Sequence, residues 1–327
     1  MGRRQRGQIV DGILLLDKPA GISSNRALQR ARGILNARKA GHTGSLDPFA
    51  TGMLPLCFGQ ATRFSQYLLD ASKCYRAVAQ LGQATETGDP EGEVVERQAF
   101  GDFSEAELAA VVKDLTGVID QRPPMYSALK HEGKRLYELA RAGIEVPRPT
   151  RQVTIHRLTA RRLGADQLEL EVHCSKGTYI RTLVEDLARA LGTVAFCAEL
   201  RRLWVGPFAE QPMLTLEALE AQPQTERLLP VDFPLRWMPR VSLSPQEATA
   251  VRHGQPLTGR LTIEPADGNT ALDGGEADRL IRLYAGEEFL GLARQTPAGL
   301  APAKILPVSE RPISEPGAAA PAEDRSS

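Results

Sequence analysis

The chain has 327 residues, of which 42% are hydrophobic and 24% are charged, and its formal net charge is zero. This is the composition of an ordinary globular protein, and every apolar run is far shorter than the ~20 residues that a membrane-spanning helix needs. The basic N-terminus is not followed by the apolar stretch of a signal peptide, so a cytoplasmic location is expected. The four cysteines are isolated, which argues against a zinc site or a disulfide framework and predicts buried, reduced thiols.

The zero net charge hides a strong segregation along the chain. Residues 1–76 contain 12 Lys/Arg and 4 Asp/Glu, a net charge of +8, whereas residues 77–120 contain 2 and 10, a net charge of −8. RNA binding depends on the local field rather than on the total charge, so a basic face on a neutral protein can follow a phosphate backbone. Charge runs are also common on solvated surfaces, and both interpretations stay open at this point.

In the first third of the chain we expect short strands alternating with helices. A basic, mobile arm over residues 1–8 precedes a buried strand over 12–17 and a helix over 25–35, capped by Ser23 or Ser24. A shaped loop over 41–55 leads to a helix over 61–69. The strand expected over 74–81 places Tyr75, Ala77, Ala79 and Leu81 on one face. An acidic loop over 83–92, a strand over 93–97 and a helix from Ser104 to about Gly117 follow.

The later part of the chain begins with a basic and aromatic insertion over residues 122–150, which suits a projecting RNA-facing element or a hairpin with solvated lysines. Strands are expected over 153–155, 167–174 and 200–205, with an amphipathic helix over 179–191. Residues 211–240 are helical and then rich in proline. We expect a catalytic domain over 9–238, a small β-rich domain over 239–308 with a loose loop at 267–278, and a disordered tail over 309–327. The fold class is α+β.

The loop over residues 41–55 carries a single carboxylate, Asp47, among Gly41, Gly44, Pro48 and Gly52. Glycine permits positive φ and close backbone approach, and proline fixes φ, so these residues predict a loop of defined shape. The loop lacks both phosphate-loop patterns, the Gly-Lys-Ser/Thr ending and G-x-G-x-x-G. A metal site built on His42, Asp47 and His173 lacks a further ligand at the usual spacing. The loop sequence alone leaves two alternatives for Asp47, a catalytic carboxylate or a structural turn residue.

The segment from Gly41 to Gly52, GHTGSLDPFATG, resembles the characteristic loop of the TruB family of tRNA pseudouridine synthases. Other segments resemble that family in the same chain order, and the likeness extends from about residue 11 to residue 234. They are LDKPAG at 16–21, KCYRA at 73–77 with Leu81-Gly82, MYSALK at 125–130, SKGTYIRT at 175–182 and LRRL at 200–203.

The resemblance implies a pseudouridine-synthase fold, with a mixed, largely antiparallel central sheet flanked by helices, and a small C-terminal domain of the PUA type. It also implies isomerisation of uridine to pseudouridine at position 55 in the T-loop of tRNA. The base leaves its N1 bond to ribose, rotates and is rejoined through C5, after extrusion from the folded RNA loop. The reaction is redox-neutral and needs no cofactor or metal.

The family's site residues carry over to matching positions of this chain. Asp47 is the expected catalytic carboxylate, and the resemblance leaves open whether it attacks C1′, attacks C6 or removes a sugar proton. Arg181 pairs with Asp47, and the hydroxyl of Tyr75 moves the C5 proton. His42 fills the space that the base leaves. Further substrate contacts fall to Tyr179 and Leu200, and to the candidate RNA-backbone ligands Lys18, Lys130 and Lys176, although Lys18 could instead brace the catalytic loop.

Two departures from the family pattern, Ser45 in place of alanine and Phe49 in place of leucine, keep the side-chain volume roughly in class. We expect a monomer that binds the T-stem and loop of tRNA without an obligate protein partner. A tRNA-folding chaperone with secondary catalysis and a guide-dependent rRNA pseudouridine synthase are the alternatives. The basic insertion over 122–150 favours the stand-alone enzyme, since a guide-dependent enzyme delegates recognition to its guide.

Overall fold

The computed structural model describes residues 7–223, 225–259, 261–266 and 280–307. The chain divides into two compact units, with the boundary between Trp237 and Met238. The expectations for most of the N-terminal arm, for the loop at 267–278 and for the C-terminal tail lie outside the described residues. Within the described residues, no helix is long and apolar enough to cross a membrane.

The first unit is built on an eight-stranded mixed sheet with the strand order β1-β3-β12-β4-β11-β10-β7, and β2 pairs with β3. All neighbours are antiparallel except β12 and β3, which run parallel over two residue pairs. This confirms the expectation of a mixed, largely antiparallel sheet. The strands are β1 (Gly12–Lys18), β2 (Ala40–His42), β3 (Thr51–Phe58), β4 (Lys73–Leu81), β7 (Gly117–Gln121), β10 (Arg151–Arg162), β11 (Gln167–Cys174) and β12 (Ala195–Val205).

Helices begin where the sequence supplies capping residues. The Ser23 hydroxyl accepts a hydrogen bond from the Arg26 amide at the start of α1 (Ser24–Ile34). Ser104 and Glu107 form a capping box at the start of α3 (Glu105–Asp114). The remaining helical segments of this unit are η1 (Gly59–Phe64), α2 (Ser65–Asp70), α4 (Leu136–Arg141), α5 (Ile180–Ala190), η2 (Gly206–Phe208), α6 (Leu216–Ala221), η3 (Thr225–Arg227) and η4 (Phe233–Leu235).

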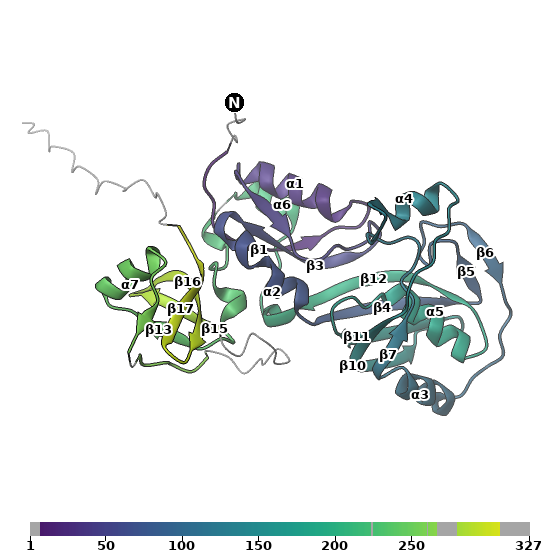
Figure 1. Ribbon diagram of the computed structural model, residues 1–327. Coiled ribbons are helices and arrows are strands. Elements are labelled where there is room, and N and C mark those ends of the chain that lie inside the picture. Colours follow the sequence, from purple (N-terminus) through teal and green to yellow (C-terminus); the bar gives the residue numbers. More distant parts are fainter. Residues whose placement is uncertain (1–6, 224, 260, 267–279, 308–327) are drawn as a thin grey trace, which may run out of the picture. The chain divides into compact units, whose positions relative to one another are not determined.

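Separate apolar clusters hold these helices to the sheet. Helices α1 and α6 pack beside each other over β1 and β3, whereas α5 and α3 cover the part of the sheet formed by β4, β10 and β11 (Figure 1). A third cluster joins β1 and β3 to η1, α2 and η2. The cluster under α5 also contains Leu46 and Ala50, so the loop between β2 and β3 is anchored in the core on both sides of Asp47.

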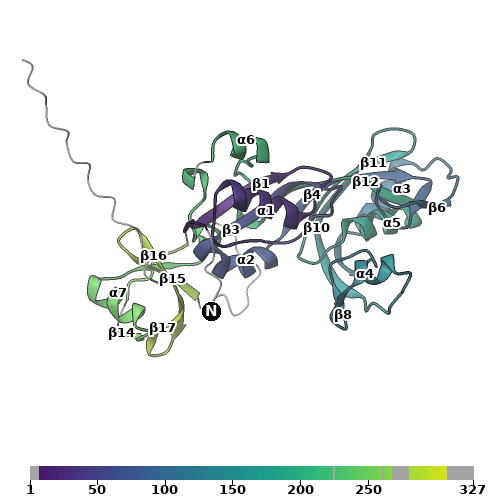
Figure 2. The same ribbon diagram turned by 90° about the horizontal axis from the view of Figure 1, so that it is seen from above.

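The insertion after β7 projects from the unit, with α4 and β8 at its end (Figure 2). It contains the short hairpin of β8 (Lys130–His131) and β9 (Lys134–Arg135) in addition to α4. A second small hairpin, β5 (Gln83–Thr85) with β6 (Val94–Arg97), lies between β4 and α3 in the chain.

The second unit is a five-stranded sheet with one helix. Its strand order is β13-β15-β16-β17-β14, and only β13 and β15 are parallel. Its core contains Val241, Val251, Leu283 and Ala293. The elements are β13 (Arg240–Ser242), α7 (Pro245–Arg252), β14 (Leu257–Thr258), β15 (Leu280–Ala285), β16 (Glu288–Thr296) and β17 (Gly299–Ile305).

Several sequence-based boundaries are wrong, and bulges explain two of the errors. Strand β12 begins at Ala195, whereas the sequence predicts its start at residue 200. The prediction fails because register shifts at 197/199 and 202/204 interrupt the alternation of inward and outward side chains. Strand β10 continues to Arg162, past a bulge at 155/157. The expected loop over 41–55 is a loop only at 43–50, since its ends are strands β2 and β3. Strands β5 and β7 were not predicted; both are short.

Candidate active site

The loop between β2 and β3 (residues 43–50) is fixed by hydrogen bonds from outside it. The Ser24 hydroxyl accepts from the Leu46 amide at 2.8 Å and donates to the Leu46 carbonyl at 3.0 Å. The ammonium of Lys18 donates to the carbonyls of Pro19 and Ile22 at 2.8 Å and of Pro48 at 3.2 Å. With Leu46 and Ala50 buried on either side, the loop presents the half-buried Asp47 to the exterior.

Arg181, on the first turn of α5, joins Asp47 to a second carboxylate. Its Nε lies 3.1 Å from Oδ2 of Asp47, and its Nη1 lies 3.1 Å from Oδ2 of Asp89. The guanidinium also donates to the backbone carbonyls of Thr87 and Tyr126. The Arg181 and Asp89 side chains are only 4% and 5% exposed, whereas Asp47 is 39% exposed. Asp47 is therefore the accessible end of a buried charge network.

Opposing effects act on the protonation of Asp47. The pKa of its carboxyl lies above the ordinary value, because burial raises it and Asp89 acts in the same direction, whereas Arg181 and Lys18 offset only part of this rise. Because the carboxylate touches a guanidinium and more than a third of it is exposed to water, we take the ionised form as the one present at neutral pH. A carboxylate held in this way is suited to act as a nucleophile or to stabilise developing positive charge.

Tyr75 and Leu200 face the same core from neighbouring strands. Tyr75 of β4 lies opposite Arg202 of β12, and Leu200 lies opposite Ala77. Tyr75 and Leu200 are each 8% exposed. Burial raises the pKa of the Tyr75 phenol, and the positive charge of Arg202 acts in the opposite direction.

Tyr179 and His42 are the other predicted substrate contacts. Tyr179 precedes α5, and its backbone is held by the Gln121 amide, which accepts from the Tyr179 N–H at 2.9 Å and donates to its carbonyl at 3.0 Å. His42 ends β2, and burial, assisted by Arg202, lowers the pKa of its imidazole. Its buried Nδ1 has no hydrogen-bond partner among the described residues. The histidine is therefore neutral at neutral pH, which suits stacking or hydrogen bonding better than phosphate binding.

The three predicted lysines differ from one another. Lys18 is fully buried, and its bonds to three carbonyls favour the loop-bracing alternative over a phosphate contact. Burial lowers the pKa of Lys18 to about 8. Lys176 is exposed and forms an ion pair with Asp70 at 2.8 Å. Lys130 is exposed on β8, in the projecting insertion.

Sequence reasoning missed Asp89, Arg202 and Gln121. Asp89 lies in a segment that reads as an ordinary acidic turn, and Gln121 is the last residue of an unpredicted edge strand. Arg202 belongs to the family-like segment LRRL at 200–203, but the resemblance assigns no role to it. None of these residues has a local pattern that indicates a site, because each acts on a residue far away in the chain.

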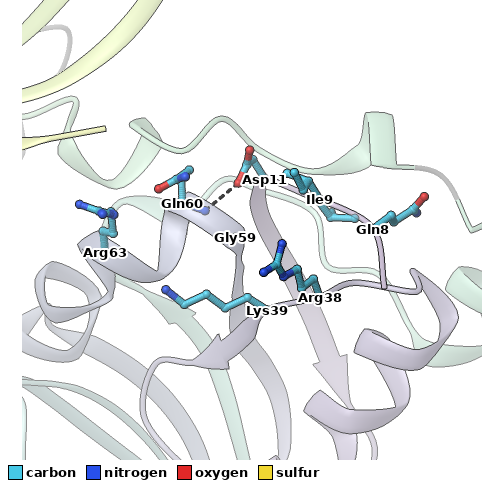
Figure 3. Close-up of a pocket in the computed structure, with 9 residues that line it drawn as sticks. Gln8, Ile9, Asp11, Arg38, Lys39, Gly59, Gln60 and Arg63 are labelled. Carbon is cyan, nitrogen blue, oxygen red and sulfur yellow. Dashed lines mark hydrogen bonds between the residues drawn. The ribbon is translucent and has the colours of Figure 1, made fainter. Parts of the chain in front are cut away.

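Two of the cavities in the first unit bear on the site. One, of about 660 Å³, is lined by Phe49, Leu200, Glu91 and Arg76, among others, and so adjoins the catalytic loop and the β12 contact residue. The other, of about 300 Å³, is basic. Figure 3 shows Arg38, Lys39 and Arg63 around it, with the Asp11 carboxylate accepting a hydrogen bond from the backbone N–H of Gln60 at 2.7 Å. Among the described residues, no group of three His, Cys, Asp or Glu side chains could hold a metal ion, and all four cysteines are buried free thiols, as predicted.

Comparison with known proteins identifies the family of the chain. Residues 32–180 match the N-terminal domain of TruB family pseudouridylate synthases, residues 181–236 match the C-terminal domain of tRNA pseudouridylate synthase B, and residues 239–306 match the C-terminal segment of pseudouridine synthase II TruB. A tRNA pseudouridine synthase B from Chromohalobacter salexigens is 48% identical over 310 residues, covering 94% of this chain and 97% of that protein. One from an Azoarcus species is 48% identical over 309 residues, covering 94% and 98%.

A solved structure supports the fold assignment. The crystal structure of a Cbf5-Nop10-Gar1 complex contains a chain that aligns with a TM-score of 0.69 at 26% identity, covering 91% of this chain and 86% of that one. The expected pseudouridine-synthase fold is thereby confirmed. The matched domains and the full-length relatives show that the chain belongs to the TruB family of pseudouridylate synthases, isomerases that convert uridine to pseudouridine.

Proposed function

We propose that the protein isomerises uridine at position 55 in the T-loop of tRNA. The observation that carries the proposal is the half-buried Asp47 on its fixed loop, paired with Arg181 at 3.1 Å. Its relatives are named as enzymes that act on tRNA. The relatives' substrate and the site's geometry together support this reaction for this chain.

The reaction requires a uridine that has left its stack. The extruded base enters beside Asp47, against the side chains of Tyr75, Tyr179 and Leu200, while His42 fills the space that the base leaves. Asp47 acts as an ionised carboxylate at C1′, at C6 or on a sugar proton, and Arg181 holds it in place and in its charged form. Tyr75 then moves the C5 proton after the base has been rejoined through C5.

Recognition of the rest of the tRNA falls to basic surfaces of the catalytic unit. The cavity around Arg38, Lys39 and Arg63 contributes three cations against one carboxylate, Asp11, and suits a backbone phosphate. The projecting insertion contributes Lys130 and further basic residues. We assign the second unit, by its position and β-rich sheet, as a PUA-like RNA-binding domain, and we propose that the enzyme works as a cytoplasmic monomer without an obligate protein partner.

Replacing Asp47 with Asn tests the catalytic assignment, because asparagine keeps the shape of the side chain and loses its charge. Pseudouridine at position 55 is mapped in tRNA after incubation with either protein, and tRNA affinity is measured in parallel. We expect Asp47→Asn to abolish product formation while tRNA binding stays close to that of the unchanged protein. Turnover near the wild-type level would falsify the role of Asp47.

A T-arm hairpin tests the stand-alone function. Purified protein should modify a hairpin that contains the T-stem and loop, and it should leave a hairpin with cytidine at position 55 unmodified. A requirement for a guide RNA or for other proteins would instead place this chain with the guide-dependent enzymes.

A further inference from the structure

Arg202 is a buried cation at the centre of the catalytic unit. Its side chain lies on β12 with 1% of the residue exposed. None of the ion pairs formed by the described residues includes it. A buried guanidinium without a carboxylate partner is costly, so its contacts have to account for its presence.

Two of those contacts go to the strand and loop that carry the catalytic aspartate. Nε donates to the Met53 carbonyl at 2.7 Å, and Nη2 donates to the Gly44 carbonyl at 3.2 Å. Gly52 lies opposite Arg202 in the parallel pairing, with φ of +98°, and a Cβ there would lie 2.2 Å from the Arg202 carbonyl oxygen. The loop of Asp47 is thus packed directly against Arg202.

The third contact goes to Tyr75. In the antiparallel pairing of β12 with β4, Arg202 lies directly opposite Tyr75, so the two side chains share one face of the sheet. Burial raises the pKa of the Tyr75 phenol, and the positive charge of Arg202 opposes this rise by favouring the phenolate. One buried cation therefore holds the loop of Asp47 and lies beside the proposed proton acceptor.

We propose that Arg202 is a positioning residue for Tyr75, which fixes the phenol oxygen relative to the Asp47 loop and supplies the charge that supports a phenolate during removal of the C5 proton. This inference rests on the proposed function, in which Tyr75 moves that proton. Arg202 acts through Tyr75 and does not itself touch the substrate.

The step that Arg202 assists comes after C5 has bonded to C1′. The C5–H bond breaks, the proton passes to the phenolate oxygen of Tyr75, and the electron pair returns to the uracil ring, which regains its C5–C6 double bond. N1 takes up a proton from water, and the phenol returns its proton to solvent. Removing the positive charge beside the phenolate makes this step slower and leaves the earlier steps at Asp47 less affected.

The test uses the full-length protein in single turnover, with tRNA that carries deuterium at C5 of the target uridine. We expect Arg202→Met, which removes the positive charge, to slow product formation by ~10- to ~100-fold, at or below the low end of what positioned acid–base groups contribute. The C5 isotope effect should become larger than in the unchanged protein, and the pH–rate profile should move to higher pH. Affinity for tRNA should change little.

Arg201→Met is the matched control, because Arg201 is the neighbouring residue on β12 and forms two hydrogen bonds with Asp17 at 2.9 and 2.8 Å. This variant should lose thermal stability without any change in the isotope effect or the pH profile. If Arg202→Met slows the reaction but leaves both of these readouts unchanged, Arg202 is only a structural residue and the inference is overturned.

Tyr75→Phe separates this inference from the proposed function. If Tyr75→Phe leaves the C5 step unaffected, the proposed role of Tyr75 fails. If Tyr75→Phe affects that step and Arg202→Met does not, only the role of Arg202 fails. Should Arg202→Met not fold, 3-fluorotyrosine at position 75 tests the phenolate in the intact protein. Its more acidic phenol should move the pH profile to lower pH, and an unmoved profile contradicts the inference.

Discussion

Replacing Asp89 with Asn is the most direct test of the charge network that holds Asp47. The change removes one of the two carboxylates that contact Arg181 and keeps the shape of the side chain. Asp89 and Arg181 are 5% and 4% exposed, so solvent cannot replace the lost charge. Breaking a buried ion pair costs about 3 to 5 kcal/mol when the remaining charge is left without a partner.

The expected cost here is smaller, because Arg181 keeps Asp47 as a counter-ion and the asparagine oxygen can still accept a hydrogen bond. We take about 2 to 3 kcal/mol, which corresponds to a rate that is ~30- to ~150-fold lower if the loss appears in the transition state. The change also frees Arg181 to shift toward Asp47, which would misplace the carboxylate relative to the sugar.

The rate is measured in single turnover, from tritium released from tRNA labelled at C5 of uridine, and tRNA binding and thermal unfolding are measured separately. Asp102→Asn is the control, since Asp102 is 92% exposed and its ion pair with Arg162 lies away from the site. It should leave the rate unchanged. A wild-type rate for Asp89→Asn, in a folded protein, would refute the idea that Asp47 depends on a second carboxylate.

Three further predictions concern the basic cavity, Lys18 and Gln121. Lys39→Glu should weaken tRNA binding and reduce the slope of log affinity against log salt by about 1 to 2, and an unchanged slope in filter binding excludes the basic cavity. The rate should fall above about pH 8 as Lys18 loses its proton. The free energy of unfolding in urea should rise between about pH 8 and pH 10.5, because Lys18 keeps its proton in the unfolded chain and has released it in the native one. A rate that stays level through that range contradicts the bracing role. Gln121→Leu should lower the free energy of unfolding by about 1 to 3 kcal/mol and slow turnover, since the partly buried N–H and C=O of Tyr179 lose their partners.

The sequence predicts the strands and helices whose pattern is local. Strand β11 has the predicted bounds because Leu168, Leu170, Val172 and Cys174 alternate without interruption and are all buried. Helix α1 begins where Ser23 caps it. Strands β10 and β12 were cut short, since each contains a register shift that interrupts the period of two. The errors therefore fall where tertiary pairing overrides the local pattern.

The site follows the same division. Asp47 and Arg181 could be named in advance because their segments resemble those of a known family, and the structure places them in contact at 3.1 Å. Asp89 and Arg202 could not be assigned roles, because their value depends on contacts made across 92 and 158 residues of sequence. Long-range contacts of single polar residues leave no periodic pattern in the sequence.

The two buried arginines hold different parts of the catalytic loop, and the position of the second explains why residue 52 is glycine. Arg181 holds the side chain of Asp47, whereas Arg202 holds the loop backbone through Gly44 and the neighbouring strand through Met53. For the second arginine to reach the loop, its own backbone has to pass so close to Gly52 that a Cβ would lie 2.2 Å from the Arg202 carbonyl oxygen. Glycine at that position is thus required by the arginine behind the loop. The same guanidinium therefore positions both residues that are proposed to act on the uridine, Asp47 through its loop and Tyr75 through the neighbouring strand. A displacement of the loop would move both of them together.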